Sequence, residues 1–177
     1  VGIHQYRVSE KEEQYLNNFL NQKLPENITS PPDIIGLYAM GSTSSVGQSS
    51  ESDFDIWICY PHQLDDERVE LLSRKAQLIT QWAESLDVEL NFFLIPDNKF
   101  RVHNSSGMTM DACGSSQHML LLDEFYRTSL RIAGKRILWR HIPFKYEQNY
   151  DEYVQSLYDN GELNPEHWLD LGGFHCI

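Results

Sequence analysis

The sequence predicts an α+β domain with a small mixed sheet flanked by helices. Three short runs rich in aromatic and branched residues, at 34–40, 53–60 and 88–95, have the length of buried strands. Between the second and third runs, residues 65–87 carry apolar side chains at steps of three and four, which is typical of an amphipathic helix. The order of strand, Gly-rich turn, strand, helix and strand predicts the α+β class.

The first 33 residues are expected to form a helix and a linker ahead of the sheet. Residues 9–24 have apolar side chains at helical spacing, and Ser9 with Glu12 forms a capping-box pattern at their start. Residues 25–33 contain three of the chain's seven prolines, and the residue before a proline disfavours a helix. We therefore place the first boundary at residue 33.

The core is expected to span residues 34–145. Its first strand leads into a Gly/Ser-rich stretch that begins with Gly41 and Ser42, and the second strand, helix and third strand follow. Residues 97–116 are rich in Gly, Ser and Asn and predict a long loop. A helix is then expected over residues 117–139.

Residues 146–177 are interpreted as the start of a following helical region that has been truncated. A helix is expected over residues 149–159, with Gly161 beyond its end. Asn164 and Pro165 have the pattern of an N-cap and a first-turn proline, which predicts a further helix to Leu171.

Composition limits the classes of function. The 177 residues include 14 Lys and Arg against 26 Asp and Glu, a formal net charge of −12. Affinity for nucleic acids rests on Lys and Arg, so nucleic-acid binding is disfavoured. The chain has neither a long apolar run nor the apolar region of a secretory signal at its start, so we expect a cytoplasmic protein without a membrane span. The three cysteines, Cys59, Cys113 and Cys176, are expected to be reduced.

The basic residues are concentrated in one segment. Residues 125–146 contain no acid, whereas residues 147–177 contain seven acids and no Lys or Arg. On the expected helix, Arg127, Arg131 and Lys135 would recur every four residues along one face. Two interpretations remain open: the basic segment and the acidic regions neutralise each other, or they form two halves of a site for a metal-bound polyphosphate.

Two acids on the second expected strand suggest a metal site. Asp53 and Asp55 are two residues apart, so their side chains point to the same face and both carboxylates can bind one metal ion or bridge two. Glu89 is placed in the middle of the third expected strand between apolar neighbours, where a carboxylate needs a partner such as a shared cation. Carboxylates suit Mg²⁺ or Mn²⁺, and a two-metal site stabilises the attacking and leaving oxygens of phosphoryl transfer.

The glycine-rich turn supplies the complementary half of such a site. Gly41 lets the backbone approach a phosphate closely, and the Ser42 hydroxyl adds a donor. Taken singly, each signal has a plainer explanation, because a D-x-D can be a solvated strand face and a Gly/Ser stretch can be a simple loop. Their order and spacing together favour metal-assisted transfer of a nucleotidyl group.

These residues carry a family resemblance. The Gly-Ser turn, the D-x-D and the third acid resemble the nucleotidyltransferase superfamily typified by DNA polymerase β, which implies its fold. More narrowly, four strings resemble the class I adenylate cyclases of enteric and related Gram-negative bacteria: YAMGSTSSVGQSSESDFDIWIC, VELNFFLI, CGSSQHMLLLDEFYRTSLRIAGKRILW and EHWLDLGG. The resemblance extends from residue 15 to residue 173.

The resemblance implies conversion of ATP to 3′,5′-cyclic AMP and pyrophosphate. It implies Asp53 and Asp55 as metal ligands, and Glu89 as third ligand and general base. The substrate contacts that we assign with it are Gly41, Ser42, Arg127, Arg131, Lys135 and His118. The chain departs from the superfamily pattern in two places: the third acid is Glu where many members have Asp, and Ser45 stands where an Arg is often found.

Two other functions remain open at this stage. One is transfer of a nucleoside monophosphate to a protein, a tRNA or a small-molecule hydroxyl. The other is a non-catalytic nucleotide-binding fragment. The resemblance also implies regulation by the sugar phosphotransferase system, through a C-terminal region that these residues do not include.

Overall fold

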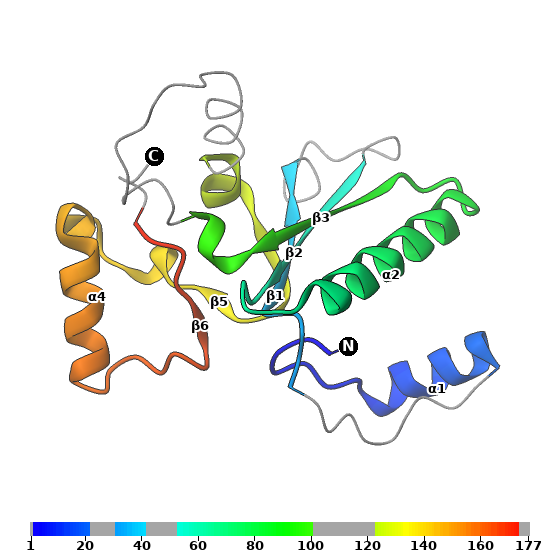
Figure 1. The fold of residues 1–177 in the computed structure, drawn as a ribbon, viewed down its shortest axis with the longest axis horizontal. Coiled ribbons are helices and arrows are strands. Elements are labelled where there is room, and N and C mark those ends of the chain that lie inside the picture. The colour runs from blue at the N-terminus through cyan, green and yellow to red at the C-terminus, as the bar shows by residue number, and fades with distance from the viewer. Residues whose placement is uncertain (1, 22–30, 42–52, 101–122, 174–177) are drawn as a thin grey trace.

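The structure, a computed structural model, describes residues 2–21, 31–41, 53–100 and 123–173 (Figure 1). The strands are β1 (Gly36–Met40), β2 (Phe54–Tyr60), β3 (Leu90–Pro96), β4 (Leu130–Gly134), β5 (Arg136–Ile137) and β6 (Trp168–Leu169). The α-helices are α1 (Glu10–Leu20), α2 (Asp66–Glu84) and α4 (Tyr150–Asp159), with a short helical segment at 123–128. Three 3-10 helices span Asp97–Phe100, Trp139–His141 and Phe144–Asn149. The predicted α+β class, a small mixed sheet flanked by helices, is confirmed.

The main sheet has four strands in the order β3-β2-β1-β4. β1 pairs antiparallel with both β2 and β4, whereas β2 and β3 are parallel. In this register Met40 lies opposite Asp55, at one end of β1. Gly36, at the other end of β1, lies opposite Gly134. A second, two-stranded sheet joins β5 and β6.

Different helices cover the two faces of the main sheet. α2 packs on one face through Leu72 and Ala76, which contact Ile58 in one buried cluster. The helical segment 123–128 packs on the opposite face, where Phe125 is fully buried and its ring stacks on that of Trp57, with the centroids 4.9 Å apart. Figure 1 shows α2 and this segment on opposite sides of the strands.

Local capping explains where the first two helices begin. The capping box of α1 is confirmed, with Ser9 and Glu12 bonded to each other's backbone N–H groups. The Asp65 side chain accepts from the Arg68 N–H at the start of α2. Arg68 also forms an ion pair with Asp33, whose side chain is 2% exposed, so the segment before β1 is attached to α2.

The predicted helix over residues 117–139 is wrong in its second half. Residues 117–122 lie outside the described part, and the helical segment ends at 128, where β4 and β5 follow. Pairing with β1 outweighs the local helical spacing, and Gly134 has φ +88°, which no right-handed helix contains. Arg127, Arg131 and Lys135 therefore do not share one helix face.

The predicted helix from Asn164 to Leu171 is also wrong, whereas that over 149–159 is confirmed as α4. The Asn164 side chain accepts from the Glu166 N–H, which closes a turn instead of capping a helix. Trp168 and Leu169 then pair with β5.

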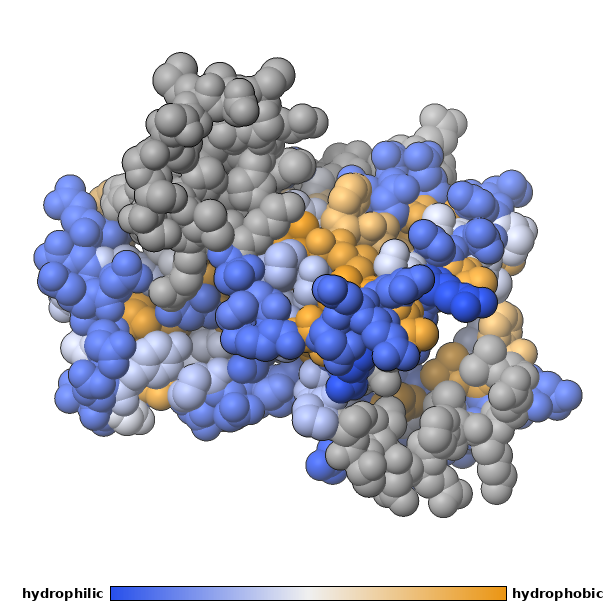
Figure 2. Space-filling model, viewed as in Figure 1, coloured by the Kyte–Doolittle hydropathy of each residue, from blue (hydrophilic) through white to orange (hydrophobic). Residues whose placement is uncertain are grey.

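The described surface differs in polarity from one region to the next. Figure 2 shows hydrophobic residues gathered around α2 and β3, and the exposed side chains there include Leu78, Trp82 and Phe93.

Cys59 is a buried free thiol whose pKa is raised by burial, and the other two cysteines lie outside the described residues. Among the described helices, none is long and apolar enough to cross a membrane.

Substituting Gly134 by alanine is expected to destabilise the chain by about 3 kcal/mol, through its positive φ and the collision of a Cβ with the Ile35 carbonyl oxygen and Gly36. Gly161→Ala is the matched control, because Gly161 also has positive φ (+70°) but nothing within 4 Å of its Cβ position. It should cost only about 1 kcal/mol. Urea denaturation measures both, and equal losses would contradict the assigned packing.

Candidate active site

The acid pair lies at one end of β2, on the sheet face opposite α2. Asp55 is the second residue of β2 and is partly buried, and Asp53 directly precedes the strand and is exposed. Alternation along the strand places both on the same face as Trp57. Because Met40 lies opposite Asp55, the turn that begins at Gly41 starts beside this pair. The sheet thus brings Asp53, Asp55 and Gly41 to one edge, as the spacing predicted.

Glu89 lies at the same edge, in a different setting from the one expected. It precedes β3 and is exposed, so the prediction of a carboxylate within an apolar strand is wrong. Its carbonyl oxygen accepts from the Phe54 N–H at 2.8 Å, and the parallel register pairs Phe54 with Leu90. Continued by one residue, this register brings Glu89 level with Asp53.

The three carboxylates do not form a closed cage. Within the described ranges, no group of three or more His, Cys, Asp or Glu side chains is close enough to hold a metal ion. The edge therefore presents carboxylate oxygens on one face, open to solvent at Asp53 and Glu89.

Asn91 is a site residue that the sequence reasoning missed. Its Nδ2 donates to Oδ1 of Asp55 at 3.1 Å, and the two residues are paired in the β2–β3 register. This hydrogen bond fixes the orientation of the Asp55 carboxylate. The available signal was spacing, because Asn91 follows Glu89 by two residues and so shares its face.

Gly41, the residue directly after β1, lies beside the helical segment 123–128. It has φ +62°, a conformation that favours glycine. A Cβ at Gly41 would lie 3.6 Å from Oε1 of Glu124, near the start of this segment. The predicted contacts Ser42 and His118 lie outside the described residues.

Arg127 is carried by the same helical segment. Its Nε donates to both carboxylate oxygens of Asp123, at 2.8 and 2.9 Å, one turn earlier. Arg127 is exposed and also lines a cavity of about 450 Å³ together with Trp139 and Arg140. Because residues three apart share a helix face, Arg127 lies on the side of Glu124, which faces Gly41.

Arg131 is directed away from the acid pair. Its Nη1 donates to the Gly134 carbonyl oxygen at 2.9 Å. Gly134 is paired with Gly36, at the end of β1 opposite the one beside Asp55.

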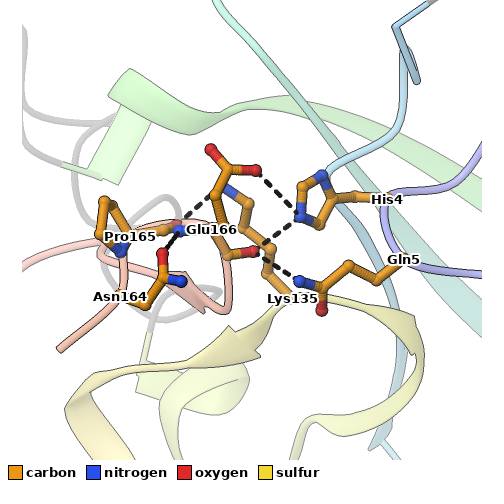
Figure 3. A network of polar contacts seen from close by, with 6 residues as sticks. All are labelled: His4, Gln5, Lys135, Asn164, Pro165 and Glu166. Atoms are coloured by element: carbon orange, nitrogen blue, oxygen red, sulfur yellow. Dashed lines mark hydrogen bonds and ion pairs between the residues drawn. The ribbon is translucent and has the colours of Figure 1, made fainter.

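Lys135 is engaged in a contact between distant segments. Its Nζ donates to the Pro165 carbonyl oxygen at 3.0 Å. The adjacent Glu166 carbonyl oxygen receives His4 Nε2 at 2.6 Å and Gln5 Nε2 at 3.2 Å (Figure 3). The structure therefore places Lys135 in a junction between the N-terminal segment and the residues before β6, apart from the acid pair.

Comparison with known proteins identifies close relatives. The profile of the family described as "Adenylate cyclase NT domain" matches residues 1–140. The chain is 51% identical over 180 residues to adenylate cyclase of Escherichia coli strain K12, and 51% identical over 182 residues to that of Salmonella typhimurium strain LT2. Both alignments cover 99% of this chain and 21% of the relative, so the chain spans about a fifth of the relatives' length.

Among solved structures, a crystal structure of a toxin–antitoxin with AMP-PNP is similar at 18% identity. That alignment covers 85% of this chain and 89% of the other, with a TM-score of 0.33. A similarity this distant supports no inference about the site.

Replacing Phe125 by alanine is expected to destabilise the chain by about 3–5 kcal/mol, because the ring is fully buried on Trp57 and truncation leaves a cavity. The matched control is Phe144→Ala, because the Phe144 side chain is 86% exposed. The control should change stability by less than about 0.5 kcal/mol. A small loss at Phe125 in urea denaturation would show that the segment 123–128 is not anchored as described.

Proposed function

The chain belongs to the adenylate cyclase N-terminal domain family, and on that premise we propose that it carries the site that converts ATP to 3′,5′-cyclic AMP and pyrophosphate. The observation that carries this proposal is the gathering of Asp53, Asp55 and Glu89 at one edge of one sheet face, beside the turn at Gly41. Carboxylates beside a phosphate-binding turn are what metal-assisted nucleotidyl transfer requires.

The donor set of this edge fits Mg²⁺ or Mn²⁺. Both ions prefer oxygen ligands, and Mg²⁺ is commonly held by one or two carboxylates together with substrate phosphates. Asp53 and Asp55 would hold the ion, and the open arrangement of the described carboxylates suits completion by phosphate oxygens. When bound, the ion would neutralise charge on the phosphates and lower the pKa of the attacking hydroxyl.

The residues of the chain then have separate tasks in the transfer. The ribose 3′-oxygen forms a bond to the α-phosphorus, the bond from that phosphorus to the bridging β-oxygen breaks, and pyrophosphate leaves. Glu89 accepts the proton of the 3′-hydroxyl, and its exposure lets that proton pass on to solvent. Asn91 keeps the Asp55 carboxylate in one orientation during turnover.

Gly41 and Arg127 would hold the triphosphate. The turn at Gly41 lets backbone N–H groups approach a phosphate oxygen. Arg127 lies on the helix side that faces this turn, and a phosphate would compete with Asp123 for its guanidinium. This assignment favours Arg127 over Arg131 and Lys135, whose side chains are bonded at the far end of β1 and at Pro165.

Product identity tests the proposed function. ATP labelled at the α-phosphate, incubated with the chain and Mn²⁺, should give labelled cyclic AMP. Label on a protein, tRNA or small-molecule hydroxyl would instead identify a transferase. Binding of Mn²⁺–ATP that survives loss of Asp53, with no product, would identify a non-catalytic nucleotide-binding module.

Asp55→Asn should lower kcat more than about a hundredfold, because a metal ligand loses its charge. Asn91→Ala should lower kcat by about 10- to 100-fold, because only the orientation of Asp55 is lost. Asp151→Asn, the same carboxylate loss in the first turn of α4, is the control and should leave turnover unchanged. An Asn91→Ala variant with wild-type turnover would contradict the role assigned to that hydrogen bond.

Glu89→Gln should lower kcat by about 10²- to 10⁴-fold, because an amide cannot accept the proton of the 3′-hydroxyl. Initial rates of cyclic AMP formation measure the effect. A variant with wild-type turnover would transfer the role of base to another group.

A further inference from the structure

A cavity of about 270 Å³ is lined by side chains from β4, β5 and the 3-10 helix Trp139–His141. The described residues that line it are almost all basic: Arg131, Arg136, Arg140 and His141, with Ile137 as the apolar member. None of these described lining residues carries a carboxylate, and the sequence from residue 125 to residue 146 contains no acid.

The three arginines have only neutral partners in the described part of the chain. Arg131 donates to the Gly134 carbonyl oxygen, and Arg140 donates to Tyr126 O and Ser129 Oγ, both at 3.2 Å. The guanidinium of Arg136 lies over the Trp168 ring, 5.9 Å from its centroid. None of the three is in an ion pair there, so their charges are not neutralised by a carboxylate in the described ranges.

The electrostatic effect of this cluster is visible at His141. Burial lowers the pKa of its imidazole, and the positive charges of Arg136 and Arg140 lower it further. The ring is held edge-on against Trp168, with the centroids 4.5 Å apart, and Arg136 contacts the same indole. Shared contact with one indole keeps Arg136 and the His141 ring in place before any ligand arrives.

This cavity lies away from the acid pair. Arg131 reaches Gly134, which is paired with Gly36, whereas Asp55 is paired with Met40 at the other end of β1. Four residues of strand separate the two levels by about 14 Å. A phosphate seated beside Gly41 would therefore not reach the guanidinium of Arg131 at Gly134. Arg140 lies between the two regions, because it lines both this cavity and the one that Arg127 lines.

We propose that Arg131, Arg136, Arg140 and His141 form a second anion-binding site, which takes a phosphate-class oxyanion. Guanidinium groups match the oxygens of a tetrahedral oxyanion with paired N–H donors, and Arg suits this task better than Lys. The volume admits a phosphate group with a small organic substituent. The oxyanion comes either from free inorganic phosphate or from the phosphates of a nucleotide, and the test distinguishes these sources.

His141 is the built-in probe of occupancy. Its ring C–H resonance, assigned by comparison with a His141→Asn variant, is titrated by NMR in phosphate and in chloride of equal ionic strength. Inorganic phosphate should raise the pKa of His141 by about one unit, because a bound anion stabilises the imidazolium against Arg136 and Arg140. Sulfate, which stays doubly charged across the range, should have the same effect and bind more tightly as pH falls through that pKa.

A matched pair of variants ties the response to the cluster. Arg136→Gln should weaken sulfate binding about tenfold, because one charge-assisted contact is lost. Lys145→Gln removes the same charge from the same acid-free segment at a residue that does not line the cavity, and should leave binding unchanged. A pKa of His141 that ignores both anions, or an equal effect of the two variants, would overturn the proposal.

Two further experiments identify the ligand and test whether this second site is independent of the candidate active site. A response to ATP without divalent ions, in addition to phosphate, identifies a nucleotide as a source, whereas a response to phosphate alone identifies the free oxyanion. Asp55→Asn should leave the response of His141 intact even where it abolishes turnover. If the anion no longer shifted the pKa of His141 in Asp55→Asn, the anion would be bound at the candidate active site, and the proposal of a second site would be wrong.

Discussion

The stack of Trp57 on Phe125 is the contact on which the candidate active site depends. Trp57 follows Asp55 by two residues on the same face of β2, and Phe125 is the residue after Glu124. The rings lie nearly parallel, at 17°, and Tyr38 from β1 closes the cluster edge-on to Phe125. This aromatic cluster therefore fixes the position and direction of the helical segment 123–128 on β1 and β2. The acids belong to the sheet and the segment brings the cation Arg127, so the distance between them is fixed by burial of apolar rings and not by their mutual attraction.

The fold distributes charge differently from what the linear sequence suggests. The acid-free stretch from 125 to 146 would form one basic helix face if its spacing were read alone. In the structure it is divided among the helical segment, β4, β5 and two 3-10 helices. Arg127 remains on the side of Gly41, Arg131 reaches toward the opposite end of β1, and Arg131, Arg136 and Arg140 line one cavity. With a net charge of −12, a pocket whose described lining is arginine and histidine without a carboxylate is a local exception. Such an exception attracts small anions even though the molecule as a whole repels polyanions.

The sequence predicted those parts of the fold whose determinants lie within a few residues of each other along the chain. The first three strands, α2 and the capping box of α1 follow from alternation, helical spacing and capping residues within a few positions. β4 does not, because Leu130–Gly134 is a strand only through pairing with Gly36–Met40, nearly a hundred residues earlier. The same holds for β6, where Asn164 and Pro165 resemble a helix start but their side-chain turn leads into pairing with β5. Spacing of Arg127, Arg131 and Lys135 at four residues was therefore a misleading signal.

The positions of Asp53, Asp55 and Glu89 also depend on long-range pairing, and their exposure explains why the three carboxylates do not form a closed cage. Sequence spacing placed Asp53, Asp55 and Glu89 at one edge, but the parallel register of β2 and β3 brings Asn91 against Asp55, and no local pattern fixes that register. Three carboxylates held together in an apolar cage would repel each other strongly, whereas exposure of Asp53 and Glu89 leaves their charges screened by water. The neutral amide of Asn91 donates a hydrogen bond to Asp55 and adds no fourth negative charge. The edge can therefore stay folded without a bound ion, and a metal that arrives with a triphosphate would supply the positive charge that draws the carboxylates together.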